Sequence, residues 1–335
     1  MGVGTFEVRF HVVLTTHERC DLLARTLSSL AAAARPEGFE RVVVVENGAN
    51  EGARAVCERH ASQLPLAYHR VAHPGKSRAL QWAVSQLRTG FVLFLDDDVR
   101  VAPELLESYA EAAREHGAGH FYGGPLSIDY EVEPPHWLLR HLPPSARGWE
   151  PGSERDPLPG GDRFLGANFG AFAEDLLAVG GFDPHLGPGA LRPGTADNPT
   201  GQERAIQDRM LEAGLRPVYV PRARVWHYVP AERCSERWAL HRWFRMSSSR
   251  RMLGELRHPT PGVRWLGAPL GLWGDLARAA VSVGAAGLAG DAQRRFRARR
   301  RFHTIRGEIR GHQLARARSK GAWPGGDGPQ HESTV

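Results

Sequence analysis

The sequence predicts an α/β fold with a mainly parallel sheet covered by helices on both faces, followed by a C-terminal helical extension. Two observations lead to this prediction. Strand-like apolar runs alternate with helical runs over roughly the first 125 residues, which is typical of parallel sheets. In addition, the five apolar residues 91–95 run directly into Asp96, Asp97 and Asp98. So short an apolar run indicates a strand buried on both faces rather than a helix.

The elements follow from local pattern. Strands are runs of β-branched and large apolar residues, and helices carry their leucines on one face. Pro-rich segments at 134–137 and 142–144 indicate irregular loops, and the Gly- and Pro-rich stretch 187–201 predicts a mobile loop. We expect strands at 8–15, 41–46, 66–71, 91–95, 166–172 and 216–220, and helices at 18–34, 51–63, 77–87, 103–115, 174–179, 202–213 and 235–252.

The composition is that of an ordinary soluble globular protein, with 335 residues, 41% hydrophobic and 24% charged. Three widely spaced cysteines indicate neither a disulfide framework nor a zinc site. No signal peptide is evident at the start, and no stretch reaches the ~18 apolar residues of a membrane span. These features favour a cytoplasmic protein.

Polar residues follow each of the first four expected strands. Because parallel strands bring their carboxyl ends to one edge of a sheet, these residues should converge there. Carboxylates suit Mg²⁺ or Mn²⁺, and lysine and arginine suit phosphate oxygens. Each segment alone is also explained by caps and turns, whereas their convergence favours a metal-assisted nucleotide site. The residues are Thr15, Thr16, Glu18, Arg19, Glu46, Asn47, Lys76, Arg78, Asp96, Asp97 and Asp98.

Over Val8 to Met252, the order of several motifs resembles the family 2 glycosyltransferases, whose fold is the Rossmann-like GT-A nucleotide-diphospho-sugar domain. The motifs are Val44-Val45-Glu46-Asn47-Gly48, Gly75-Lys76-Ser77-Arg78-Ala79, Asp96-Asp97-Asp98, Gly166-Ala167-Asn168-Phe169-Gly170-Ala171-Phe172 and Val179-Gly180-Gly181-Phe182-Asp183.

The resemblance implies an inverting, metal-dependent transfer of a sugar from a nucleotide-diphospho-sugar, foremost a UDP-sugar, to a hydroxyl of a metabolite, glycan or lipid. It implies that Glu203 is the catalytic base and that the converging residues from Thr15 to Asp97 bind the donor. Mn²⁺ or Mg²⁺ would be held by Asp98, Asp96 and His227. The acceptor would meet Asn168, Trp137 and Gln202.

Two departures from the family pattern matter. The family carries Gly-Glu-Asp before its acceptor-side helix, whereas this chain has Gly201-Gln202-Glu203, so one carboxylate is replaced by an amide. Ala239 stands where processive members carry the Gln of Q-x-x-R-W, which favours a non-processive enzyme. Two alternatives stay open: a sugar nucleotidyltransferase, although residues 15–19 lack the glycines of its loop, and an inactive binding or scaffold protein.

Three regions are expected along the chain. Residues 1–255 form the GT-A domain, with a donor half to about 125 and an acceptor half from about 126. Residues 256–320 form a basic helical extension, and 321–335 a disordered tail. The net charge of +6 lies largely in residues 294–301. We expect no nucleic acid partner, and consider peripheral contact with an anionic membrane, a solvated arginine face, and a homodimer.

Overall fold

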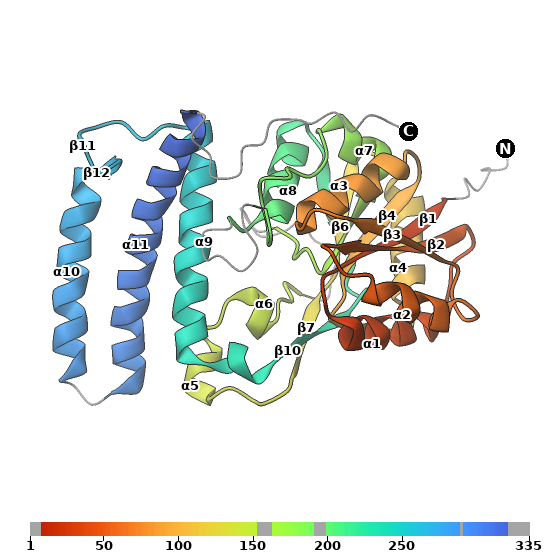
Figure 1. Cartoon of the computed structure of the whole chain (residues 1–335), viewed down its shortest axis with the longest axis horizontal. Coiled ribbons are helices and arrows are strands. Elements are labelled where there is room, and N and C mark those ends of the chain that lie inside the picture. Colours follow the sequence, from red (N-terminus) through yellow and green to blue (C-terminus); the bar gives the residue numbers. More distant parts are fainter. Residues whose placement is uncertain (1–7, 153–162, 191–198, 289–290, 321–335) are drawn as a thin grey trace. The chain divides into compact units, whose positions relative to one another are not determined.

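The computed structural model describes residues 8–152, 163–190, 199–288 and 291–320. The chain forms two compact units (Figure 1). Unit 1 comprises Met1–Pro184 and Gln202–Cys234, and unit 2 comprises His185–Gly201 and Ser235–Val335. The expected disordered tail, and most of the expected mobile loop, lie outside the described residues.

The core of unit 1 is a seven-stranded sheet, and it confirms the expected α/β fold. The first four strands in the spatial order are mutually parallel, β8 is antiparallel to both of its neighbours, and β6 and β9 are parallel. The order is β3 (Leu66–Val71), β2 (Phe39–Asn47), β1 (Phe10–Thr16), β4 (Phe91–Asp96), β8 (Asn168–Phe172), β6 (His120–Gly123) and β9 (Arg216–Tyr219).

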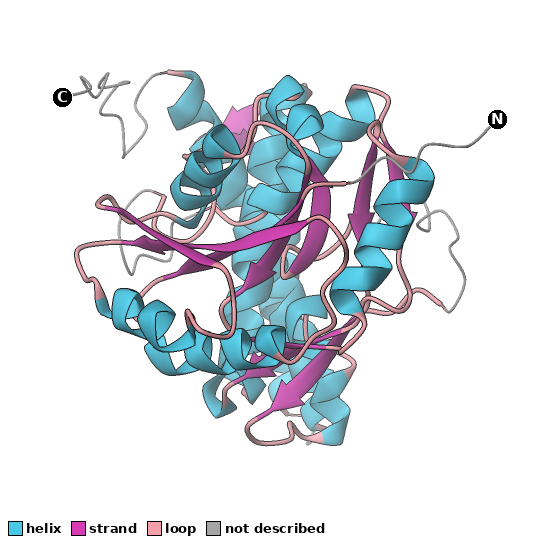
Figure 2. Ribbon diagram, turned by 90° about the vertical axis from the view of Figure 1, so that its right-hand side faces the viewer, coloured by secondary structure: helices cyan, strands magenta, loops and turns pink. Residues whose placement is uncertain are grey.

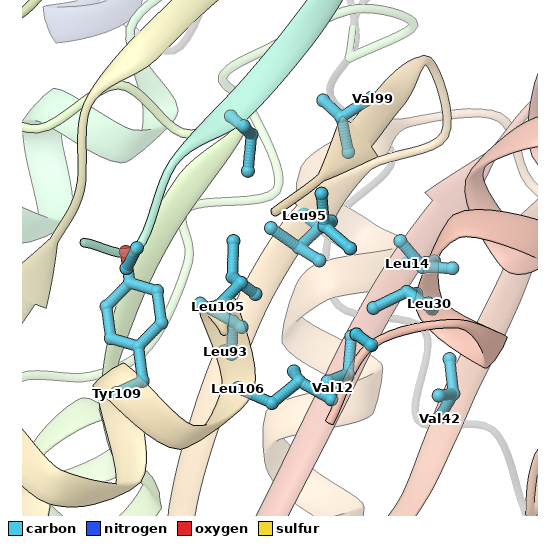
Figure 3. Packing of buried hydrophobic residues seen from close by; sticks show 14 of the residues in the cluster. Val12, Leu14, Leu30, Val42, Leu93, Leu95, Val99, Leu105, Leu106 and Tyr109 are labelled. Carbon is cyan, nitrogen blue, oxygen red and sulfur yellow. The ribbon is translucent and has the colours of Figure 1, made fainter. Parts of the chain in front are cut away.

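Both faces of this sheet are covered by helices (Figure 2), and alternate residues of β1 serve the two faces. Val12 and Leu14 pack with α1 (Cys20–Ala31), α2 (Gly52–His60) and α4 (Leu105–His116), as Figure 3 shows for Leu30, Leu105 and Leu106. Val13 faces α3 (Lys76–Gln86), α7 (Ala173–Ala178) and α8 (Gln202–Glu212). Burial on both faces explains why these strands read as continuous apolar runs.

A second, three-stranded sheet in unit 1 was not expected from the sequence. Its order is β5 (Val99–Val101), β10 (Val225–Val229) and β7 (Leu126–Tyr130), with β10 antiparallel to β5 and parallel to β7. The Pro-rich segment expected to be irregular contains two single-turn helices, α5 (His136–Leu139) and α6 (Pro144–Arg147), and the turn η1 (Ala231–Cys234) follows β10.

Unit 2 is built on three long helices and a small hairpin. They are α9 (Glu236–Arg257), β11 (Arg264–Trp265), β12 (Ala268–Pro269), α10 (Leu270–Gly287) and α11 (Ala292–Ser319). The expected boundary at residue 255 therefore falls within α9. Within the described residues, no helix is both long enough and apolar enough to cross a membrane.

Two glycines let α11 lie directly against α9. A Cβ added at Gly307 would overlap the carbonyl oxygen of Phe244, and one added at Gly311 would overlap that of Ser248. Both pairs advance in the same chain direction, so the two helices run parallel. Helix α10 packs on the other side of α11 through Ala279, Ile305 and Ile309 (Figure 1). The close approach of two backbones allows an arginine-rich helix to be packed with few large apolar residues.

Candidate active site

The three aspartates after β4 enter three different environments. Asp96 receives the ammonium of Lys76, with its Oδ1 at 2.5 Å from Nζ. Asp97 accepts a hydrogen bond from the Thr16 hydroxyl at 2.6 Å and lies 2.9 Å from Nη1 of Arg19. Asp98 is paired with Nη2 of the same arginine. The repulsion expected among three adjacent carboxylates is therefore relieved by cationic side chains from neighbouring elements.

Asp97 is turned into the protein. It is 2% exposed, and burial raises its pKa to about 6, with Asp98 adding to the rise and Arg19 opposing it. Its partners come from the end of β1 and the start of α1. The Asp97 carboxylate, which was expected to bind the donor, thus already contacts Thr16 and Arg19.

Asp96, Asp98 and His227 form the one potential metal-holding group among the described residues, with candidate ligand atoms within 4.8 Å of one another. His227 lies in β10 opposite Val99, and the amide of Tyr228 donates to the Asp98 carbonyl at 2.8 Å. The second sheet thereby brings the imidazole to the end of β4. This is the ligand set expected from the sequence.

The donor set fits a divalent cation. Asp98 Oδ1 is buried without a hydrogen bond, although His227 Nε2 lies 3.3 Å away. An imidazole nitrogen and a carboxylate oxygen that face each other at this distance suit two ligands of one ion. Burial would raise the pKa of Asp98, but His227 and Arg19 outweigh it and hold that pKa well below its usual range. Ionised carboxylate oxygens with one imidazole suit Mn²⁺, and Mg²⁺ accepts the carboxylates.

Lys76 joins this group to the start of α8. Its Nζ lies 3.1 Å from Glu203 Oε1 as well as 2.5 Å from Asp96. Burial would lower the pKa of Lys76, but the two carboxylates raise it well above its usual value. Gln202 Nε2 also donates to Glu203 Oε1 at 2.8 Å. Glu203 is therefore oriented by two donors.

Glycine at position 166 provides the space for this carboxylate. A Cβ at Gly166 would overlap Cγ and Cδ of Glu203. The glycine that opens the Gly166-Ala167-Asn168 motif is thus explained by the side chain that lies against it. The missing side chain at position 166 leaves room for Glu203.

Two expected donor residues hold the loops in place. Asn47 donates to the Thr16 carbonyl at 2.8 Å and accepts from the amide of Gly75 at 3.0 Å, so it ties the end of β1 to the start of α3. Glu46 is buried and accepts from the amide of Ala53 in the first turn of α2 and, at 2.8 Å, from the Tyr68 hydroxyl. Both of these partners belong to the protein.

Asn168 is placed differently from what the resemblance implied. Its Nδ2 donates to the carbonyls of Ala223 at 2.7 Å and Pro125 at 3.1 Å, and its Oδ1 accepts from Tyr109 at 2.7 Å. The residue is 0% exposed. Because the amide is engaged in the core, this arrangement gives Asn168 a supporting position under the site, without a surface for an acceptor.

The other expected residues are distributed as follows. Thr15 is buried beside Asp96 in the sheet register, and Glu18 is exposed and accepts from Asn50 at 2.5 Å. Trp137 lies half-buried in α5, and Arg78 half-buried in the first turn of α3.

Two residues were missed from the sequence. Arg233 Nη1 lies 4.0 Å from Asp98 Oδ2. Thr26 on α1 bonds the carbonyls of Asp97 and Val99 at 2.9 and 2.8 Å, which fixes the turn that carries the aspartates. A basic residue shortly after His227 was a signal for the first. Thr26 gave none, because a buried threonine in a helix is ordinary.

The fold is that of a GT-A domain. Residues 11–172 match the model of Glycosyl transferase family 2. The Succinoglycan biosynthesis protein ExoM of Rhizobium meliloti (strain 1021) is 35% identical over 119 residues, which are 35% of this chain and 38% of that protein. The match thus spans well under half of this curated relative.

Two solved structures share the fold. The mannosyltransferase PcManGT from Pyrobaculum calidifontis, in complex with GDP-Man and Mn²⁺, has a TM-score of 0.57 and 19% identity, over 92% of this chain and 88% of that chain. GalNAc-T7 with UDP, GalNAc and Mn²⁺ has a TM-score of 0.50 and 13% identity, over 75% of this chain and 51% of that chain. At these identities the likeness shows the fold alone.

Proposed function

We propose that the protein is an inverting, metal-dependent, non-processive glycosyltransferase. It moves a sugar from a nucleotide-diphospho-sugar, foremost a UDP-sugar, to a hydroxyl of a metabolite, glycan or lipid. The observation that carries the proposal is the position of Lys76, which bonds both Asp96 of the metal-holding group and Glu203. The Lys76 ammonium thus joins Asp96, on the donor side, to Glu203, which is suited to act as a base.

Similar proteins support a nucleotide-diphospho-sugar as the class of donor. The two structures with this fold contain GDP-Man or UDP together with Mn²⁺. In this chain, the Asp96, Asp98 and His227 group lies at the carboxyl edge of the sheet, where ligands of open α/β sheets bind. A nucleotide diphosphate held there with a divalent ion accounts for the group.

Glu203 is the proposed base. Its side chain is 17% exposed, so it is reachable, while Lys76 and Gln202 fix its direction. It would take the proton of the acceptor hydroxyl as that oxygen attacks the anomeric carbon from the face opposite the diphosphate. A bound ion on Asp98, Asp96 and His227 would supply positive charge beside the departing diphosphate. Lys76 orients the Glu203 carboxylate.

Calorimetry with UDP and GDP tests the donor site directly. Each nucleotide is titrated with and without Mn²⁺ into the wild type, into Asp98→Asn, and into the control Asp129→Asn. Asp129 is a fitting control because it is a partly exposed aspartate paired with Arg25. We expect Mn²⁺ to tighten UDP binding at least tenfold in the wild type and the control, and not in Asp98→Asn.

Each outcome of the titration has a clear meaning. Equal, metal-independent affinity in all three proteins would exclude this group as a metal site. Tighter binding of GDP than UDP would leave the site in place and overturn the choice of UDP.

A further inference from the structure

The β11–β12 hairpin joins α10 at one end of unit 2 (Figure 1). Large apolar side chains are exposed there. Val263, Trp265, Leu266 and Leu270 are 76%, 53%, 62% and 54% exposed. They lie within eight residues of one another in the chain. Single exposed apolar residues are common on soluble proteins, but a contiguous group marks an interaction surface.

The turn of this hairpin is built to present one of them. Trp265 pairs with Ala268, so Leu266 and Gly267 form a two-residue loop, with φ of 46° and 86°. Turns with positive φ at both central residues favour Asn-Gly, because a leucine there is strained by its Cβ. Leu266 nevertheless occupies the first position and points its side chain into solvent. Such local strain at an exposed apolar tip indicates function rather than folding.

Helix α10 continues the apolar surface along its length. Its buried residues, Ala279 and Ala286, lie on the side that packs with α11. The opposite side carries Leu270, Val281 and Leu288, and the last two are 73% and 93% exposed. The residues between them on that side are small: Gly274, Ala277, Gly284 and Ala285. The outward side thus carries mostly apolar and small residues, with the exposed Arg278 and Ser282 beside them.

Positive charge lies beside the hairpin end of this surface. Gln313 of α11 donates to the Leu266 carbonyl at 3.1 Å, and the exposed Arg316 lies beside Gly267. Helix α11 carries ten arginines and a single acidic residue, Glu308. Four of the acidic side chains described in unit 2 are already paired with arginine, and the fifth caps α11: Glu236, Glu255, Asp275, Glu308 and Asp291.

We propose that the hairpin tip and the outward side of α10 dock on an anionic lipid surface without spanning it. An apolar surface bordered by excess arginine matches the chemistry of an acyl layer beneath anionic headgroups. A second copy of the chain would instead bring two positively charged surfaces together. The proposal is independent of the proposed transfer reaction, because unit 2 contains neither the metal-holding group nor Glu203.

Vesicle sedimentation with the full-length protein tests the docking, without any donor present. We expect the protein to pellet with phosphatidylglycerol vesicles at low salt, and to bind phosphatidylcholine vesicles at least tenfold more weakly. Raising the salt should release it, because exposed charges are screened. Arg316→Gln combined with Lys320→Gln should weaken binding roughly fivefold for each charge removed.

Leu266→Asn separates docking from folding. Asparagine suits the positive φ, so the variant should be at least as stable as the wild type, while vesicle binding should fall roughly tenfold or more. Val132→Asn is the matched control, because Val132 is 56% exposed but lies in unit 1. It should bind vesicles as the wild type does.

Two results would overturn the proposal. One is a protein that stays in the supernatant with phosphatidylglycerol vesicles, or that loses nothing when Leu266 is replaced. The other is a wild-type dimer in light scattering that becomes a monomer in Leu266→Asn. That result would assign the surface to a second copy of the chain.

Discussion

Replacing Asn168 with alanine distinguishes a supporting residue from an acceptor contact. The substitution removes the donors of the Ala223 and Pro125 carbonyls and the acceptor of the Tyr109 hydroxyl. The Pro125 carbonyl keeps the amide of Val225 at 3.2 Å. Ala223 therefore loses its side-chain partner, whereas the Tyr109 hydroxyl keeps a 3.4 Å contact with the backbone of residue 168 and a hydrogen bond with the backbone of Gly124.

The expected loss of stability follows from these two groups. A buried polar group without a partner costs about 1–3 kcal/mol. Asn168→Ala should thus reduce the free energy of unfolding by about 2–5 kcal/mol, a large part of the ~5–15 kcal/mol of a typical domain. Tyr109→Phe removes one of the same bonds, and should cost about 1–2 kcal/mol. The double variant should lose less unfolding free energy than the two single variants together, because the two residues share a hydrogen bond.

Urea unfolding followed by circular dichroism measures these losses. At temperatures where Asn168→Ala stays folded, the acceptor KM should match that of the wild type. A variant with unchanged stability and a raised acceptor KM would refute the supporting role and return Asn168 to the acceptor site.

Three further outcomes are expected. Glu203→Gln should keep donor affinity within about twofold and lower kcat by roughly 10² to 10⁴, the usual contribution of a general base; near wild-type turnover would assign the base elsewhere, and no turnover in the wild type would favour a scaffold protein. Gly166→Ala should lower kcat at least tenfold with little change in donor affinity, because its Cβ displaces Glu203; calorimetry and steady-state kinetics separate the two effects. Burial lowers the pKa of His11 to about 4, with Arg9 and Arg41 assisting and Glu40 opposing. The unfolded histidine titrates near 6.5, so below about pH 6.5 it takes up a proton that the buried histidine does not. The free energy of unfolding therefore falls between about pH 6.5 and pH 4, by at most about 3 kcal/mol. Below pH 6.5 the urea midpoint of the wild type should therefore fall relative to that of His11→Phe. Midpoints that change in parallel with pH would contradict the lowered pKa of His11.

The central sheet could be predicted because its strands are local features. Strand β3 begins and ends at the expected residues, and β2 and β4 differ by only one or two at most ends. The small sheet could not be predicted, because β5 has three residues and β10 pairs with segments about a hundred positions away. Pairing of that kind depends on the whole fold rather than on periodicity.

The location of the candidate site could be predicted from the sequence, but only some of its side-chain contacts could. Asp96, Asp98 and His227 come together as expected, since strand ends in a parallel sheet share an edge. Spacing along the chain does not reveal which way a polar side chain turns. Glu46 and Asn168 point into the protein, where they bond a helix start and two carbonyls.

Because Lys76 contacts both Asp96 and Glu203, it limits which residues can be changed to alter the choice of acceptor. Substitutions at the start of α8 change the partner of Lys76, and through it the charge beside the metal-holding group. A library confined to residues 202 and 203 would therefore alter both halves of the site at once. If Trp137 contacts the acceptor as the family resemblance implies, this half-buried residue of α5 is a starting point outside the pair.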